Sequence, residues 1–284
     1  MAPPQATNLT ATTPLSPAEL SYLRTSLLLS PPIRPDARSP TTFRPLTAEL
    51  DILPSTHGSS RIVWPDGGEC IVGIKAEVEK AVVDGQNKRV EVSVEVAGQR
   101  DDDPLAVFLT QSVLDTIAPR LGERLNIGER WNWKVYIDIL LLTPPISHPS
   151  TLLSLGVNLA LRCTKLPLLI SAAEEDPLFS DDWDLAKPLY PSNTPSEVPA
   201  ISLLVASVGE NVFFDPTREE MSVADCVLVV SVDYDGKVIA LRTLESGSVG
   251  EGGVNRKVVA RIVSQCAEVG REVFEGLEAI AKAG

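Results

Sequence analysis

Serine and histidine lie close together at two places in the chain, where they could build a nucleophile with its base. His57 precedes Ser59 and Ser60 by two and three residues, and Ser147 directly precedes His148. A catalytic serine needs a base within hydrogen-bond reach and a third group that orients the base, and the G-x-S-x-G turn of many hydrolases is absent. Closeness in sequence does not supply that geometry. We therefore predict no catalytic residue of the serine-hydrolase type.

Glycine-rich turns could hold a phosphate, because a turn rich in free N–H groups at a helix N-terminus binds anions. The candidates are Gly67-Gly68 and the segment GSVGEGG at 247–253. The second lies between a predicted strand and the last predicted helix, but it has neither the lysine of a P-loop nor the spacing of a dinucleotide fingerprint. We interpret it as a flexible connection between the two elements.

Carboxylates gather at three places. They are Asp101–Asp103, Asp181–Asp184, and the set Asp215, Glu219, Glu220 and Asp225. The first two clusters are predicted to lie in solvated loops. The third falls between apolar strands, where two carboxylates could bind a divalent ion or act as acid and base. The same Asp-Pro-Thr start is also typical of an ordinary turn, which is the interpretation we favour.

Histidines and cysteines are too few and too scattered for a metal centre. The chain has 2 histidines and 4 cysteines, with no C-x-x-C pair. Structural zinc sites need closely spaced ligands of these types. We predict no metal, no cofactor, and reduced thiols of the kind found in intracellular proteins.

Composition bounds the class of protein. The chain has 284 residues, 44% of them hydrophobic, and a net charge of -13, so it can bury a full core in one large domain or two halves. Because this net charge is negative, the protein as a whole repels nucleic acid and anionic membranes. Any contact with RNA must therefore depend on a local group of basic residues. No apolar run is long enough for a membrane helix, and residues 1–15, rich in Pro, Thr and Ala, predict a disordered lead-in rather than a secretory signal.

The first half of the chain predicts strands followed by helices. A capping box at Ser16 begins a short helix whose leucine stripe is expected to pack on its own domain. The turn PDGG at 65–68 joins two strands of a hairpin, with the alternating strand 89–98 as the expected partner. A helix from 105 is expected to end at Pro119. The apolar strand 131–142, expected to be covered on both faces and to lie in the middle of the sheet, and a buried helix at 150–163 follow.

The second half repeats this order. Residues 174–199 are acidic and proline-rich and form the predicted boundary. Four apolar runs predict strands, the last two joined at Asp235-Gly236, and a helix is expected from 255 to 282. We therefore predict an α/β (α+β) fold of two related units, with the lead-in at 1–15, one unit at 16–173, the connection at 174–199 and the second unit at 200–284.

A series of short motifs resembles the ribonuclease PH family, and in particular its members in the ring of the eukaryotic RNA exosome. The motifs are RPDAR at 34–38, FRP at 43–45, GSSR at 58–61, VAGQRDDDP around Gly98–Arg100, the strand VYIDILLL, and DPT at 215–217 with Glu219-Glu220. The resemblance covers residues 16 to 281. It implies a ribonuclease PH-like fold of two βαβα-type units with mixed sheets packed against helices.

The resemblance also implies partners and a location. The related subunits pair into heterodimers in a six-subunit ring, which three RNA-binding cap subunits cover and through which RNA threads to a separate hydrolytic nuclease. A member of this ring supports 3′-5′ RNA processing and decay in nucleus, nucleolus and cytoplasm. RNA contact is expected at Arg100, on the loop that faces the channel in such relatives, and secondarily at Arg61; each could instead pair with neighbouring acids.

One segment departs from the active relatives, which use inorganic phosphate as the nucleophile. Where they place a glycine-containing loop with arginine, this chain has Thr143–Pro149, in which three prolines remove three N–H donors. Ala37 also stands where the family usually has glycine. We therefore expect no catalytic residues and an inactive subunit, with Asp215 and Asp225 in structural hydrogen bonds.

Two alternatives stay open. The chain could be an active phosphorolytic exoribonuclease whose site is completed by a neighbouring subunit. It could also be an acidic interaction protein unrelated to RNA, in which case it would find no ring partners.

Overall fold

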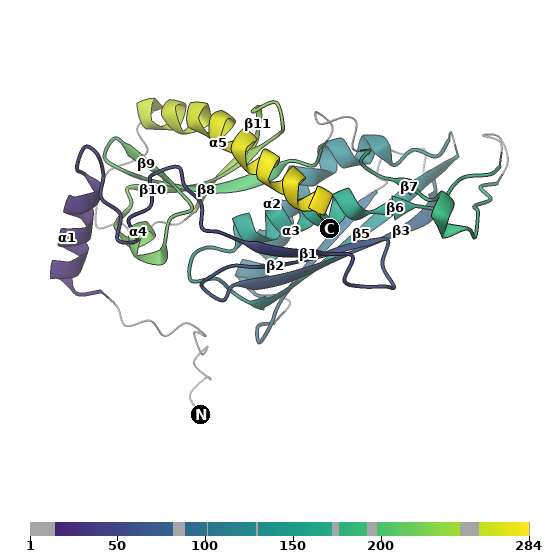
Figure 1. Ribbon diagram of the computed structural model, residues 1–284, viewed down its shortest axis with the longest axis horizontal. Helices are drawn as coiled ribbons and strands as arrows, with labels where there is room; N and C mark the ends of the chain where they lie inside the picture. The colour runs from purple at the N-terminus through teal and green to yellow at the C-terminus, as the bar shows by residue number, and fades with distance from the viewer. Residues whose placement is uncertain are drawn as a thin grey trace.

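The structure is a computed structural model that describes residues 15–81, 89–100, 102–128, 130–171, 176–191, 198–244 and 256–283. Most of the predicted lead-in, Asp101 and the glycine-rich segment 247–253 lie outside the described residues. Figure 1 shows two sheets side by side, with helices α2, α3 and α5 around and between them.

The first sheet has five strands in the order β1-β2-β3-β5-β4. Its strands are β1 (Thr47–Leu50), β2 (Gly58–Val63), β3 (Glu69–Lys80), β4 (Val90–Val96) and β5 (Trp131–Thr143). The predicted turn at 65–68 does join β2 to β3, with Val63 opposite Glu69. In β4 the valines are buried and the residues between them are exposed, because strand side chains alternate between faces.

The partner expected for strand 89–98 was wrong. β4 pairs in parallel with β5, not with the hairpin, and β5 lies between β3 and β4. A parallel neighbour requires a crossover connection, which the helix after β4 supplies. The central place predicted for β5 is confirmed, whereas its cover is one-sided within this chain, since Leu140 and Leu142 are each 37% exposed.

Helices α2 (Pro104–Arg124) and α3 (Ser150–Cys163) pack against this sheet. Asp103 caps α2 by accepting a hydrogen bond from the Leu105 N–H at 2.9 Å. The expected end at Pro119 was wrong, since the helix continues through it. Leu121 and Leu125 beyond the proline are fully buried, and their packing outweighs the lost backbone hydrogen bond.

The second sheet is antiparallel, in the order β11-β10-β8-β9. Its strands are β8 (Ile201–Val208), β9 (Asn211–Phe214), β10 (Cys226–Val232) and β11 (Val238–Leu244), and α5 (Arg256–Ala283) packs on β8 and β10. Every residue of β8 and β10 is buried. All four predicted strands and the terminal helix are thus present.

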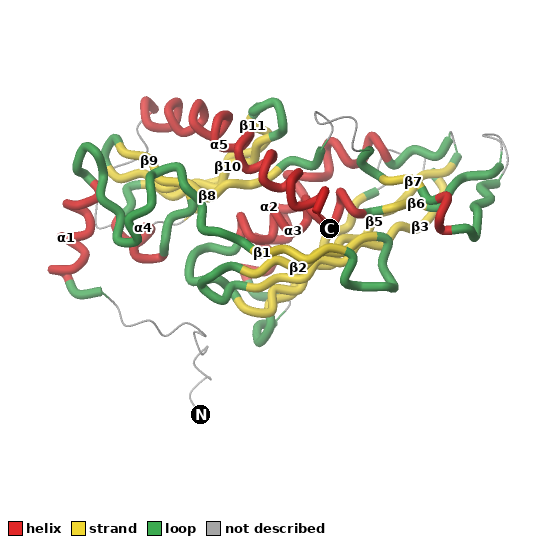
Figure 2. The backbone as a smooth tube through the Cα atoms, viewed as in Figure 1, coloured by secondary structure: helices red, strands yellow, loops and turns green. Residues whose placement is uncertain are grey.

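α3 lies between the two halves, as Figure 2 shows for the helix and the strands on either side. It contacts β2 and β3 of the first sheet and β8 of the second. Residues 150–161 are all buried, which confirms the prediction of a helix that is apolar on most sides. α3 therefore contributes side chains to the core of both halves.

α1 (Pro17–Leu27) begins at the predicted capping box, in which Ser16 and Glu19 bond to each other's backbone N–H groups. The leucine stripe of α1 packs on the second sheet, and not on its own unit at 16–173 as the sequence analysis expected. Leu23 and Leu27 lie in one apolar cluster with Leu204 of β8. The isolated sequence pattern shows which face of a helix is apolar but not which sheet receives it.

The described parts of the segment 165–191 form small elements. They are β6 (Lys165–Leu166), the 3₁₀ helix η1 (Trp183–Leu185) and β7 (Lys187–Pro188), with β6 antiparallel to β7. A further helix that the sequence analysis missed, α4 (Arg218–Val223), connects β9 to β10. None of the helices described is long and apolar enough to cross a membrane.

Candidate functional site

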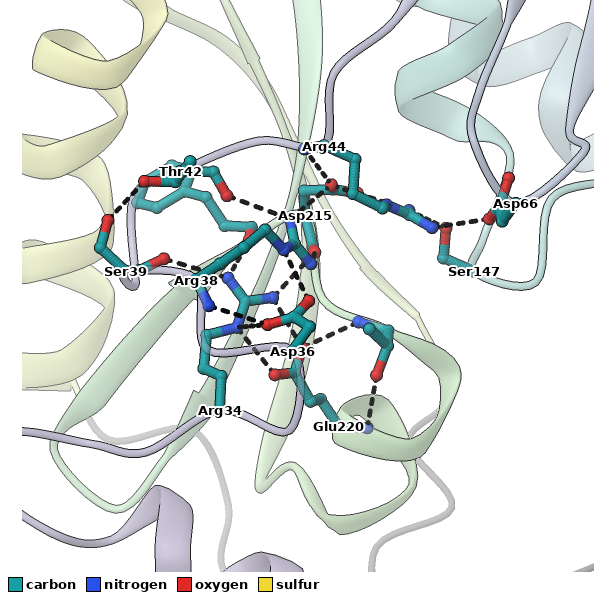
Figure 3. Close-up of polar contacts among 12 residues, drawn as sticks. Arg34, Asp36, Arg38, Ser39, Thr42, Arg44, Asp66, Ser147, Asp215 and Glu220 are labelled. Carbon is teal, nitrogen blue, oxygen red and sulfur yellow. Dashed lines mark hydrogen bonds and ion pairs between the residues drawn. The ribbon is translucent and has the colours of Figure 1, made fainter.

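Several connections meet at one end of the five-stranded sheet. β2, β4 and β5 run in one direction and β1 and β3 in the other. The residues before β1, the turn between β2 and β3, and the loop after β5 therefore share that end of the sheet. Figure 3 shows the Arg44 side chain reaching from the segment before β1 to Asp66 in the turn and Ser147 in the loop.

Arg44 uses all three guanidinium nitrogens. Its Nη1 donates to Asp66 Oδ2 at 2.6 Å, and its Nη2 donates to Ser147 Oγ and to Asp215 Oδ1, both at 2.6 Å. Nε donates to the second Asp215 oxygen at 2.9 Å, and the guanidinium carbon lies 4.4 Å from the centre of the Trp64 ring. Burial alone would lower the pKa of Arg44, but the hydrogen bonds and charges of Asp215 and Asp66 outweigh it and raise the pKa. Arg44 therefore stays charged and fully engaged.

Arg34 and Glu220 form a buried ion pair beside it. Their side chains are 0% and 1% exposed, and Nε and Nη2 of Arg34 donate to the two carboxylate oxygens at 2.8 and 2.7 Å. Glu220 also caps α4 with Thr217, each side chain bonding the other's backbone N–H. This T-x-x-E pattern was available in the sequence as a signal for α4.

Asp215 joins the two arginine-bearing motifs. Arg38 Nη1 donates to Asp215 Oδ2 at 2.8 Å, so this carboxylate, 1% exposed, lies between Arg38 and Arg44. Asp215 itself has φ +47° and Ala37 has φ +59°, both in the left-handed region. Glycine is the residue that takes this conformation at least cost, so the glycine that the resemblance implies for position 37 would relieve the backbone there.

The cluster is closed to further anions. It contains three arginines, Arg34, Arg38 and Arg44, against four carboxylates, Asp36, Asp66, Asp215 and Glu220, so its formal charge is 3 − 4 = −1. Each of these arginines has carboxylate partners within 2.8 Å. Chemically, the arrangement ties the segment 34–44 to the second sheet.

The carboxylate of Asp66 contacts the loop Thr143–Pro149, the segment that corresponds to the expected phosphate-binding loop of active relatives. The Ile146 N–H donates to Asp66 Oδ2 at 3.2 Å. Ser147, 5% exposed, is bonded to Arg44. The sequence analysis found no balancing arginine within this segment and missed Arg44, which reaches the loop from a position 103 residues away. Asp66 and Arg44 therefore engage the Ile146 N–H and the Ser147 hydroxyl of this loop.

His148 and Asp225 are also held in local structure. His148 Nδ1 lies 2.8 Å from Ser150 Oγ, and its ring meets Phe108 edge-on at 5.7 Å. Asp225 pairs with Arg24 at 2.7 Å and accepts the Gly209 N–H at 2.6 Å. Asp215 and Asp225 thus bond to different arginines, and no group of metal-ligating side chains comes together among the residues that the structure covers.

We expect His148 to make stability depend on pH. Burial lowers its pKa from 6.5 to about 4, so the unfolded chain binds the proton more tightly. This contribution is present above pH 6.5 and is lost as the pH falls toward 4; between pH 7 and pH 5 it amounts to about 2 kcal/mol. Urea unfolding at the two pH values should show a smaller pH effect in His148→Asn than in the parent. Equal pH effects in both proteins would contradict the assignment.

Arg100 and Arg61 lie at different places on the first sheet. Arg100 follows β4, at the same end as Arg44, is 86% exposed and pairs with Asp102 at 2.9 Å. Arg61 lies within β2, is 38% exposed, and pairs with Glu69 at 2.7 Å and Glu49 at 3.1 Å. Hydrogen bonds to Glu69 and Glu49 raise the pKa of Arg61. The structure does not bring these two arginines into contact with each other or with the cluster around Asp215.

Comparisons with known proteins agree with this architecture. The model of the 3′ exoribonuclease family, domain 2, matches residues 199–257. The exosome complex component RRP42 of Saccharomyces cerevisiae is 39% identical over 225 residues, covering 76% of this chain and 81% of that protein. Its counterpart rrp42 in Schizosaccharomyces pombe is 31% identical over 252 residues, covering 82% of this chain and 83% of the relative.

Solved structures show the same fold. A chain of an archaeal exosome core superimposes with a TM-score of 0.61 at 23% identity, covering 90% of this chain and 97% of that one. A chain of the Archaeoglobus fulgidus exosome with RNA bound to the active site gives the same values. The ribonuclease PH-like fold expected from the motifs is confirmed, and by its similarity to the yeast proteins the chain belongs to the RRP42 family of exosome components.

Proposed function

We propose that this chain is a non-catalytic subunit of the RNA exosome ring. In this role it pairs with other ribonuclease PH-like subunits in a six-membered ring, meets RNA-binding cap subunits, and passes RNA through the channel to a hydrolytic nuclease. Family membership supports the place in the ring. The nucleus, the nucleolus and the cytoplasm, where the exosome processes and degrades RNA, are the proposed locations.

The proposed lack of activity is supported by the loop after β5, whose polar groups bond to Asp66 and Arg44 of this chain. Phosphorolysis needs a site that grips inorganic phosphate through N–H groups and arginines. Here the Ile146 N–H and the Arg44 guanidinium already bond to Asp66, and Asp215 holds the rest of Arg44. A phosphate entering this loop would meet two carboxylates, and the like charges repel it.

The test uses the ring assembled with this chain and without the hydrolytic nuclease. Labelled RNA is incubated with and without inorganic phosphate, and release of nucleoside diphosphates is measured. We expect no phosphate-dependent shortening attributable to this subunit. Phosphate-dependent release that Asp215→Asn abolishes, with assembly intact, would instead establish the composite active site shared with a neighbour.

A second measurement addresses the loop itself. The Ile146 amide resonance of the isolated chain should not move when inorganic phosphate is added, because Asp66 accepts that N–H. The variant Asp66→Asn removes the competing negative charge, so phosphate should move the Ile146 resonance more in this variant than in the parent. Asp102→Asn on the exposed loop is the matched control and should behave as the parent does. A phosphate-induced shift in the unmodified chain would contradict the internal-anion explanation.

RNA contact is proposed at Arg100 and, secondarily, at Arg61. Among the described residues Arg100 pairs with the exposed Asp102, so exchanging this partner for an RNA phosphate costs little. Arg61 would have to leave two carboxylates. We expect Arg100→Gln to weaken binding of RNA by the assembled ring several-fold and to reduce the salt slope by about 1, with a smaller effect for Arg61→Gln. Unchanged affinity and slope in Arg100→Gln would remove this contact from the proposal.

A further inference from the structure

A pocket of about 280 Å³, which none of the residues of the cluster around Asp215 line, opens between the C-terminal ends of α3 and α5. Leu50 at the end of β1 and Val198 before β8 give it apolar walls, and the last turn of α5 borders it. Its volume is close to the lower limit of pockets that hold small ligands. Residues of both halves of the chain therefore build one concave surface.

The polar groups of this pocket are mainly donors that lack acceptors. Arg162 donates through Nε to Asn158 Oδ1 at 2.9 Å, which fixes the plane of its guanidinium. Within the described part of the chain, Nη1 and Nη2 of Arg162 have no acceptor within hydrogen-bond distance. Burial lowers the pKa of Arg162, yet an arginine remains charged at neutral pH. A half-buried cation without a full set of acceptors favours an anion beside it.

Three further residues that carry donor groups, Lys165, Tyr190 and Tyr234, also line this pocket. The hydroxyl groups of Tyr190 and Tyr234 and the ammonium group of Lys165 have no hydrogen-bond acceptor among the residues described. Burial raises the pKa of Tyr190 to about 12, so its hydroxyl keeps its proton and can donate. Burial likewise raises the pKa of Cys163 to about 11, so the neighbouring thiol adds no negative charge.

The acids at the pocket do not cancel its positive charge. Asp51 and Glu278 stand against Arg162, Lys165 and Lys282, for a formal sum of 3 − 2 = +1. Glu278 is bonded to Lys282 at 2.6 Å, and its charge also acts on Arg162, whose pKa it raises against the larger effect of burial. What remains for a ligand is the Arg162 guanidinium and the tyrosine hydroxyls, above apolar walls.

We propose that this pocket binds a carboxylate carried on a small apolar body, with the carboxylate at Arg162 and Tyr190 and the body against Leu50 and Val198. A planar carboxylate matches the two free nitrogens of a guanidinium in a bidentate pair. Such a head can belong to a free organic acid or to the C-terminal residue of another protein chain, and the chemistry of the pocket is the same for both.

The test uses the full chain and benzoate as the probe. Benzoate should bind with a Kd in the millimolar range, as seen by NMR, and should shift the methyl resonances of Leu50 and Val198. Benzamide, which has the same shape without the charge, should not bind. An acetylated tetrapeptide ending in free leucine, compared with its amide, tests the second source; tighter binding of the free peptide than of benzoate assigns the pocket to a chain end, and the reverse assigns it to a small acid.

Variants locate the contact. Arg162→Gln should weaken benzoate binding at least tenfold, and Tyr190→Phe should weaken it several-fold, since each removes a donor to a charged group. Arg271→Gln on α5 and Tyr22→Phe on α1 lie outside the pocket and should bind as the parent does. The proposal is overturned if benzoate and benzamide shift the same resonances equally in the unmodified chain, if neither acid binds, or if Arg162→Gln keeps the parent affinity.

Discussion

Replacing Arg34 with methionine is expected to lower the free energy of unfolding by about 3–5 kcal/mol, because it leaves a buried carboxylate without its counter-charge. Glu220 is 1% exposed and receives two hydrogen bonds from Arg34. Arg34 also donates to the backbone oxygens of Phe214 and Asp215, so the same substitution strips partners from the end of β9. Urea unfolding of the purified chain measures the loss as a lower midpoint with an unchanged slope.

Two further variants separate charge from packing. Arg34→Met combined with Glu220→Met removes both charges and should recover a substantial part of the loss, since an apolar pair of similar volume avoids the desolvation cost. Arg100→Met is the matched control, because its side chain is 86% exposed, and it should change stability by no more than about 0.5 kcal/mol. A loss below about 1 kcal/mol in Arg34→Met would show that the ion pair does not hold the segment in place.

Adding one methyl group at Gly58 should destabilise the fold by about 3 kcal/mol, at the upper end of overpacking effects. A Cβ at Gly58 would lie 2.5 Å from Thr164 Oγ1, 2.7 Å from Thr164 Cα and 2.8 Å from the Ala160 oxygen. Two of these three atoms belong to the backbone of α3 and its C-cap, so they cannot rotate away. β2 and α3 would have to separate, and the core between them would open.

The same substitution elsewhere has the opposite expected sign. Gly276 lies in α5, and a Cβ there meets nothing within 4 Å. Gly276→Ala should therefore stabilise the chain by about 0.5–1 kcal/mol through helix propensity. Thermal or urea unfolding of the two variants side by side gives the comparison, and a Gly58→Ala protein as stable as the parent would mean that β2 and α3 are less closely packed than the structure has them.

Local patterns in the sequence predicted most of the elements. The alternation of Val90 to Val96, the capping box at Ser16 and the turns at 65–68 and 235–236 each depend on residues within a few positions of one another. The pairing of β4 could not be predicted in this way, because an alternating strand does not specify its neighbour. The end of α2 at Pro119 was predicted wrongly for a related reason, since the packing of the residues after the proline decides whether the helix continues.

The cluster around Asp215 was only partly predictable. Its arginines were recognised as motif residues, and Asp215 was expected to make structural hydrogen bonds, as it does. Asp66 was read only as part of a turn. Its role depends on bringing together positions 22 and 80 residues away, Arg44 and Ile146, and no short-range pattern contains that information.

The long sequence separation of the contacts made by the first 45 residues sets the order in which the chain can fold as it is synthesised. The partner of Arg24, Asp225, is synthesised 201 residues later. The partners of Arg34 and Arg44 in the second half follow 186 and 171 residues later. At the usual speed of ribosomes this delay is about 10–40 s. During that interval Arg44 can already bond to Asp66 and Ser147 of the first sheet, whereas α1 and Arg34 still lack their partners in the second half. Residues 17–34 therefore remain open to chaperones and proteases until β10 has emerged.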